Sequence, residues 1–393
     1  MEGTAQGQPC LDVKIERLLP GGVGLAHADG LTLLVSLAAP GDELRVKIDR
    51  LQGKVAFASI HEILKRSPVR VEPPCPYFGR CGGCDFQQLR YDAQLQAKVD
   101  IIQDCFQRIA RIPAPVDIKI YASPNEWQYR ARALWQTDDL RKWLGYYVRG
   151  SRDVCDVEYC AVLVPELQQT LERLRSTIDS ATIARDIAAV AGDETVSVEP
   201  PLAGFEPREI TRTIAGERYH FSAKSFFQIN HQLLPALIEA ATGDEKGNSA
   251  IDLYCGVGLF TLPLSRRFDH VSAVEANERA TAFARRNLEL AGLNNAEVVT
   301  GDVGNWLRNL DPEYTADLLL LDPPRTGAEN KVISGILLLK PRRIIYVSCD
   351  PATLSRDLKK LLAGGYSLDS VSAFDMFPQT HHVETVVRLL AAQ

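Results

Sequence analysis

One cysteine and one glutamate near the C-terminus lie in sequence motifs that suit covalent and acid–base chemistry. Cys349 stands in Ser348-Cys-Asp-Pro351, where a predicted strand turns into a predicted helix. A helix N-terminus favours a thiolate, although a lone cysteine of this kind is more often an inert buried residue. Asp322-Pro-Pro-Arg325 follows the preceding strand, and Phe377-Pro-Gln-Thr-His-His-Val-Glu384 lies close to the last one. We therefore expect Cys349 to be a nucleophile and Glu384 a base.

A second set of residues predicts a nucleoside site at the same sheet edge. The turn after the first strand of the regular region, Asp252-Leu-Tyr-Cys-Gly256-Val-Gly258, lets the backbone approach a ligand closely. Thr261 replaces the third glycine of a dinucleotide motif, and no Gly-Lys-Ser/Thr follows, so neither a pyrophosphate nor a triphosphate is well served. The next three strands end in carboxylates, at Glu275, Asp302 and Asp322. Such an acidic edge suits a cationic nucleoside without phosphate, which is S-adenosylmethionine; chance turn and capping residues are the alternative.

A thiol beside a methyl donor has a chemical purpose. Carbon 5 of uracil is too weakly nucleophilic to accept a methyl group directly, but attack of a thiolate on carbon 6 gives an enolate that is nucleophilic at carbon 5. After methyl transfer, a base removes the carbon-5 proton and the thiol is expelled. Cys349 and Glu384 fit these two roles.

Three cysteines in a short loop predict an inorganic centre. The spacing is Cys75-x5-Cys81-x2-Cys84, with Cys160 as a distant fourth ligand and Cys155 as its competitor. Four thiolates hold either a [4Fe–4S] cluster or tetrahedral zinc, and the spacing does not decide between them. Radical S-adenosylmethionine chemistry also needs a cluster, but its cysteines are typically spaced x3 then x2.

Three regions of different pattern must position these residues. Residues 11–62 show short strands separated by glycine-rich turns, which predicts a small OB-like β-barrel. Residues 91–109 have helical apolar spacing, and a mixed stretch with a helix near 164–178 follows. From about residue 248, strands alternate with helices such as 277–291 and 351–362, and two further strands end the chain. This alternation predicts an α/β fold with a doubly wound parallel sheet.

The bulk composition at first argues against an RNA partner. The chain has 393 residues with 44 Lys+Arg against 50 Asp+Glu, a net charge of −6. Residues 108–152, however, hold nine basic and four acidic side chains together with Trp127, Trp135 and Trp143. Cations and flat rings suit an RNA groove, and an aromatic core under a solvated face is the alternative explanation. No apolar run is long enough to span a membrane, the N-terminus has no signal-peptide pattern, and nine cysteines indicate reduced thiols, so we expect a cytoplasmic protein.

The chain resembles the RNA uracil-5-methyltransferase family of class I, S-adenosylmethionine-dependent enzymes. The matching segments are SFFQIN (225–230), DLYCGVG (252–258), DPPR (322–325), SCDP (348–351) and FPQTHHVE (377–384). The resemblance implies Cys349 as nucleophile, Glu384 as proton acceptor, and a [4Fe–4S] cluster on Cys75, Cys81, Cys84 and Cys160. It also implies a set of S-adenosylmethionine contacts at Gln228, Tyr254, Gly256, Gly258, Glu275, Asp302 and Asp322. Leu259 departs from the family, since many members carry Asn there, and one polar cofactor contact is thereby in doubt.

The resemblance covers nearly the whole chain and implies three domains. They are a TRAM-like OB barrel (1–66), a central α+β domain with the cluster and a basic, aromatic RNA-binding surface (67–220), and a Rossmann-like methyltransferase domain (221–393). TRAM and cluster together resemble the members that act on 23S ribosomal RNA, so we expect a monomeric 23S rRNA methyltransferase. A transfer-RNA uracil methyltransferase, a methyltransferase acting on protein or on another nucleobase, and a non-catalytic RNA-binding scaffold are the alternatives.

Overall fold

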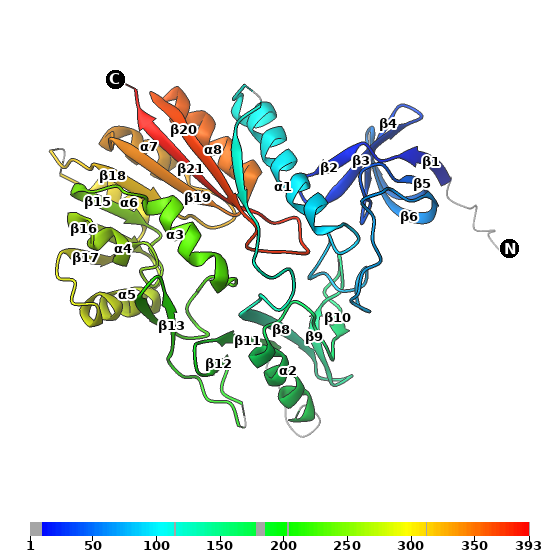
Figure 1. Ribbon diagram of the computed structural model, residues 1–393, viewed down its shortest axis with the longest axis horizontal. Coiled ribbons are helices and arrows are strands. Elements are labelled where there is room, and N and C mark those ends of the chain that lie inside the picture. The colour runs from blue at the N-terminus through cyan, green and yellow to red at the C-terminus, as the bar shows by residue number, and fades with distance from the viewer. Residues whose placement is uncertain (1–9, 114, 178–184, 203, 312, 393) are drawn as a thin grey trace.

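The computed structural model contains four β-sheets, and three of them belong to separately packed regions (Figure 1). It describes residues 10–113, 115–177, 185–202, 204–311 and 313–392. None of the helices in these ranges is long and apolar enough to cross a membrane.

The N-terminal region is one six-stranded sheet with its own small core. The strands run in the order β1-β5-β6-β4-β3-β2, antiparallel except for the β4–β6 pair. Alternate residues such as Leu33, Val35, Leu44 and Val46 are fully buried in its core, as a sheet with one apolar face requires. The strands are β1 (Cys10–Lys14), β2 (Arg17–Leu19), β3 (Val23–Ala28), β4 (Leu31–Val35), β5 (Glu43–Gln52) and β6 (Val55–Lys65).

The central region is a five-stranded antiparallel sheet covered by one helix. Its order is β10-β9-β8-β11-β12, and a separate two-stranded hairpin follows it. Trp135 and Tyr129 are fully buried, so these two rings form core rather than a surface on which bases stack, which corrects that part of the expectation. The elements are β8 (Arg132–Asp138), β9 (Trp143–Tyr147), β10 (Val154–Asp156), α2 (Pro165–Thr177), β11 (Asp186–Ala191), β12 (Val196–Glu199), β13 (Ile210–Ile214) and β14 (Glu217–Phe221).

The C-terminal region is an eight-stranded sheet in the order β17-β16-β15-β18-β19-β21-β20-β7. The strands β15 to β19 are mutually parallel, and β21 enters antiparallel between β19 and β20. Its elements are η3 (His231–Leu233), α3 (Leu234–Thr242), β15 (Gly247–Leu253), α4 (Thr261–Ser265), β16 (Phe268–Glu275), α5 (Glu278–Leu290), β17 (Ala296–Thr300), α6 (Val303–Arg308), β18 (Leu318–Leu321), α7 (Asn330–Leu339), β19 (Arg343–Ser348), α8 (Pro351–Ala363), β20 (Tyr366–Phe374) and β21 (Glu384–Ala391).

Apolar cores on both faces of this sheet make it doubly wound. One core contains residues of α3, α4 and α5, and the other contains residues of α6, α7 and α8. The helices expected at 277–291 and 351–362 agree with α5 and α8 to within one residue at each end. The predicted α/β fold of this region is confirmed.

Four elements from before or across residue 220 pack with the sheet of the last expected domain. Helix α1 (Tyr91–Cys105), its continuation η1 (Phe106–Ala110) and β7 (Ile118–Tyr121) lie in the chain before the central sheet, yet β7 pairs in parallel with β20. Ile102 and Phe106 are fully buried in the same core as α7 and α8. Tyr219 and Phe221 of β14 pack in the core on the opposite face. The sheet of the last domain therefore recruits residues from both sides of position 220.

Candidate functional site

The glycine turn after β15 has the backbone that its sequence predicts. Gly256 and Gly258 have φ of +56° and +93°, a region that L side chains rarely adopt. Nothing lies within 4 Å of a Cβ built on Gly256, so the backbone there faces open space. Tyr254 also has a positive φ of +64°, and its N–H donates to Val274 O of the neighbouring strand at 2.8 Å. The turn is held open on the side where a ligand would approach.

Thr261 stands where a dinucleotide motif has glycine, and its hydroxyl has a partner. It donates to Oδ2 of the fully buried Asp252 at 2.5 Å, while Oδ1 of Asp252 has no hydrogen-bond partner. Burial raises the pKa of Asp252 to about 7. The sequence analysis did not predict Asp252 as a site residue, although its position two residues before Tyr254 of the turn indicated one.

The carboxylates expected at the ends of strands two to four lie at one edge of the sheet, but not in equal environments. Glu275 accepts from Gly256 N at 3.3 Å and from Asn277 N at 2.7 Å, so it lies directly under the turn. Both oxygens of Asp302 accept from Lys331 Nζ at 2.9 Å. A ligand that binds Asp302 must therefore share it with a lysine.

Gln228 belongs to a segment that connects the central sheet to the last domain. It is 6% exposed, and its neighbour Phe227 packs in the core that contains Val257 of the glycine turn. Arg132 of β8 donates to Ser225 O at 2.7 Å and fixes the start of the segment. Gln228 and the glycine turn are thus brought to the same side of the sheet.

Cys349 and Glu384 lie next to the last pair of two antiparallel strands. Ser348 of β19 pairs with Thr385 of β21; Cys349 follows Ser348, and Glu384 is the first residue of β21. The charge of Glu384 acts on the Cys349 thiol, so the two side chains are close to each other. The two residues are 35 positions apart in sequence, and only the insertion of β21 beside β19 brings them together.

Burial raises the pKa of both groups. Burial, together with the negative charge of Glu384, raises the pKa of Cys349 to about 12. Burial and the nearby Asp322 raise the pKa of Glu384 well above its usual range. Arg325 opposes both shifts, since its charge lowers the pKa of each group. Arg325 comes from the DPPR segment.

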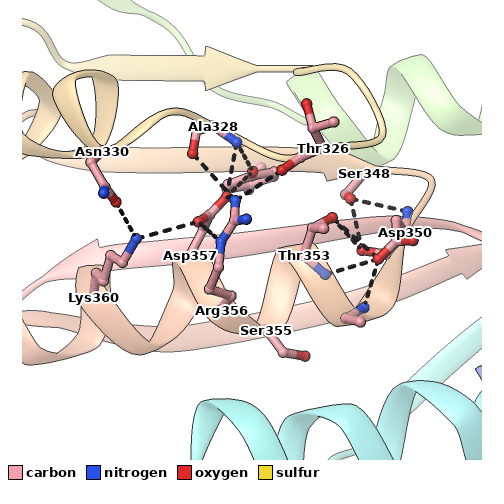
Figure 2. A network of polar contacts seen from close by, with 12 residues as sticks. Thr326, Ala328, Asn330, Ser348, Asp350, Thr353, Ser355, Arg356, Asp357 and Lys360 are labelled. Carbon is pink, nitrogen blue, oxygen red and sulfur yellow. Dashed lines mark hydrogen bonds and ion pairs between the residues drawn. The ribbon is translucent and has the colours of Figure 1, made fainter.

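A network of polar contacts surrounds α8, the helix that begins two residues after Cys349 (Figure 2). Asp350 caps α8 by accepting from Ala352 N at 3.0 Å and from Thr353 N at 2.8 Å. Thr353 Oγ1 in turn donates to Arg325 O at 3.1 Å. Further along α8, the buried Asp357 accepts from Ala328 N at 2.9 Å and from Tyr346 OH at 2.8 Å. The turn that carries the thiol and the loop that carries Arg325 are therefore braced against the same helix.

The four predicted cluster cysteines line one cavity of about 50 Å³, together with the half-buried Arg130. Cys155 is also buried, but it lies in the apolar core of the central sheet and not in the lining of this cavity. Within the described ranges, no three His, Cys, Asp or Glu side chains converge closely enough to ligate a single metal ion. Sequence reasoning did not single out Arg130, whose Nε has no hydrogen-bond partner.

The chain is similar in sequence to known RNA methyltransferases. Residues 166–392 match the family model described as tRNA (Uracil-5-)-methyltransferase. An uncharacterized RNA methyltransferase of Halalkalibacterium halodurans is 31% identical over 96% of both chains, and one of Thermotoga maritima is 30% identical over 96% of this chain and 98% of the relative.

A solved structure is similar over almost the full length. The tRNA (uracil-54, C5)-methyltransferase of Pyrococcus abyssi, in complex with S-adenosyl-L-homocysteine, has a TM-score of 0.75 and 25% identity, covering 97% of this chain and all of that one. The fold is therefore that of an RNA methyltransferase. The chain belongs to the RNA uracil-5-methyltransferase family.

Proposed function

We propose that this protein transfers a methyl group from S-adenosylmethionine to carbon 5 of a uridine in RNA, with Cys349 as nucleophile and Glu384 as base. The observation that carries the proposal is the register of β19 and β21, whose last pair, Ser348 with Thr385, adjoins both Cys349 and Glu384. A methyltransferase acting on an amino group would need no thiol at this position.

The thiol begins the reaction as the protonated form, because its pKa is raised to about 12. Arg325 supports the small thiolate fraction, since it is the cation that lowers this pKa. Its charge also faces the enolate that forms when Cys349 Sγ bonds to carbon 6 of the uracil. Carbon 5 then carries the negative charge needed to accept a methyl group.

Glu384 completes the reaction by removing a proton. After methylation, carbon 5 bears both the methyl group and its original hydrogen. Glu384 takes that hydrogen as a proton, the electrons of the C–H bond form the carbon 5–carbon 6 double bond, and the C–S bond breaks to return the thiolate. Burial, by raising the pKa of Glu384, makes its carboxylate a stronger base than an exposed glutamate.

The residues at the sheet edge fit S-adenosylmethionine, which supplies an electrophilic methyl group on a cationic sulfur when bound. Gly256 leaves room for backbone approach, and Glu275 under the turn offers acceptors for ribose hydroxyls. We assign Gln228, Tyr254, Gly258, Asp302 and Asp322 to the same site. The Pyrococcus abyssi relative was solved with the demethylated product of this donor, which supports the assignment.

We propose that the cysteine cavity holds a [4Fe–4S] cluster. A cubane is ligated through four separate irons, so its cysteines surround a volume instead of meeting at a point. The four thiols that line a cavity of about 50 Å³ fit such a geometry. Cys75, Cys81, Cys84 and Cys160 would hold the cluster, and Arg130 would offset part of its negative charge.

For the RNA we propose 23S ribosomal RNA, on the basis of an N-terminal TRAM-like barrel together with a cluster. Transfer RNA is the second candidate, because the Pyrococcus abyssi tRNA enzyme aligns with 97% of this chain, including both of those regions. In either RNA the target base must be unpaired or flipped out to reach Cys349.

Labelled S-adenosylmethionine supplied with ribosomal or transfer RNA, followed by mapping of the labelled base, tests the reaction and the substrate together. We expect 5-methyluridine in 23S rRNA. Glu384→Gln should trap RNA covalently on Cys349, because proton removal precedes release of the thiol, and Cys349→Ala should give neither product nor adduct. A Cys349→Ala variant that still methylates RNA would refute the mechanism, and label in transfer RNA alone would make that RNA the substrate.

A further inference from the structure

The loop that leads from β20 into Glu384 is held mainly from outside the methyltransferase sheet. Its residues 375–381 receive hydrogen bonds from Asp85 and Phe86, which follow Cys84 directly, and from Gln94 and Lys98 on α1. Tyr129 of the central region adds one more, from its hydroxyl to Pro378 O at 2.8 Å. The position of the base thus depends on residues about 285 positions earlier in the chain.

Asp85 makes the most contacts with this loop. Its Oδ1 accepts from His381 N at 2.8 Å, and its Oδ2 pairs with His381 Nδ1 at 2.5 Å. The backbone N–H groups of Asp85 and Phe86 both donate to Gln379 O, at 3.1 and 3.0 Å. Two residues separate His381 from Glu384, so this anchor lies close to the base along the chain.

Helix α1 fixes the middle and the start of the loop. Gln94 and Gln379 exchange two hydrogen bonds of 2.9 Å, in which Gln94 Oε1 accepts from Gln379 N and Gln94 Nε2 donates to Gln379 Oε1. Lys98 pairs with Asp375, both fully buried, and also donates to Phe377 O at 3.1 Å.

The loop conformation needs these contacts. Gln379 has a backbone φ of +67°, which is unfavourable for a residue other than glycine. The residue is only 2% exposed. A residue keeps such a backbone only where the surrounding contacts determine it, and here they come from Gln94, Asp85 and Phe86. Without them the loop would relax and carry the start of β21 with it.

We propose that Asp85 is a positioning residue for Glu384. It ties the loop at His381 and Gln379 to the segment that bears Cys81 and Cys84, and so sets the distance between the Glu384 carboxylate and the proton on carbon 5. This inference rests on the proposed role of Glu384 as base. Asp85 does not touch the substrate, and its effect falls on proton removal more than on attack by Cys349, which β19 positions.

The test uses the full-length protein with its inorganic centre and RNA, and compares Asp85→Ala with Asp92→Ala. Asp92 lies on α1 and pairs only with the exposed Arg90, so it is a matched control without contact to the loop. We expect Asp85→Ala to lower kcat by roughly tenfold to a hundredfold, the size of effect that a misplaced reacting group produces. KM for S-adenosylmethionine should change less than threefold, and the methylated RNA–Cys349 adduct should accumulate on denaturing gels.

Asp85→Asn should restore turnover, because Asn still accepts from His381 N and can donate to the ring nitrogen. Gln94→Met, which removes both bonds to Gln379 without changing the cysteine segment, should also accumulate adduct and keeps the test valid if Asp85→Ala loses its metal. Normal turnover in Asp85→Ala, or loss of activity without adduct in both variants while Glu384→Gln traps RNA, would overturn the inference. If Glu384→Gln itself traps no RNA, the proposed role of Glu384 fails first, and the inference fails with it.

Discussion

At the scale of single residues, Arg325 decides how readily the thiol reacts. Cys349 has its pKa raised to about 12 by burial and by Glu384, and Arg325 is the group that lowers it. Far below that pKa, the thiolate fraction rises tenfold per pH unit. The fraction of Glu384 in the carboxylate form, which is the active base, also rises with pH. Both dependences have the same sign, so methyl transfer should accelerate as pH rises from about 6.5 to 9.

Arg325→Met removes a cation that acts on both groups and should raise the pKa of Cys349 further. A shift of one unit corresponds to about 1.4 kcal/mol and a tenfold loss of thiolate, so we expect about tenfold slower single-turnover methylation at pH 7.5. The rise of rate with pH should move to more alkaline values, and Arg325→Lys should recover part of the rate because it keeps the charge. An unchanged pH profile in Arg325→Met would show that the arginine does not act on the thiol.

At the scale of elements, the cap of α8 ties local stability to the reaction centre. Asp350 accepts two backbone N–H bonds at the start of α8 and follows Cys349 directly. Asp350→Ala should lower the free energy of unfolding by about 1 kcal/mol, as loss of an N-cap does, while activity falls by a larger factor because the thiol turn moves.

The matched control is Asp138→Ala, which also removes a carboxylate that accepts two backbone N–H bonds, from Leu140 and Arg141. Chemical denaturation should show a similar small loss of stability in the control, with methyl transfer unchanged. Equal activities of the two variants would mean that the α8 cap contributes stability alone.

The elements also show what the sequence could and could not predict. Strand–helix alternation placed Glu275, Asp302, Asp322 and Cys349 at one edge, because the carboxyl ends of parallel strands meet there. The closeness of Cys349 to Glu384 depends on β21 entering between β19 and β20, which no local pattern specifies. Aromatic content likewise did not reveal that Trp135 faces the core, since composition carries no information about which face of a strand is buried.

At the scale of the whole molecule, the cysteine segment and the residues directly after it contact the central sheet, the loop before Glu384 and the N-terminal region. Gly82 N donates to Tyr147 O of the central sheet at 2.9 Å, and Asp85 N donates to the loop before Glu384. Gly22 of the N-terminal sheet lies so close that an added Cβ would meet Asp85 and His381 at 3.2 and 3.1 Å. Loss of a cluster from this segment should therefore disturb several regions together.

Cys81→Ala should remove the iron, lower the melting temperature and weaken RNA binding. Binding of S-adenosylmethionine should be little changed, because the glycine turn packs in a separate core. Metal analysis and visible absorption measure the first effect, and calorimetry and a filter-binding assay the others. Cys10→Ala, at an exposed thiol, is the control. Zinc in the wild-type protein, or full RNA binding in Cys81→Ala, would contradict the cluster.

The pairing of β7 with β20 also governs how the chain can fold as it is synthesised. Ile102 and Phe106 emerge early with apolar surfaces whose partners include residues 344–389, and β7 cannot pair until residues 366–374 have been made. About 250 residues separate the two strands. At the usual translation rate of roughly 5–20 residues per second, β20 is therefore synthesised some 12–50 s after β7. During that interval the early segment has no sheet to join, so completion of the reaction centre is delayed until translation is almost finished.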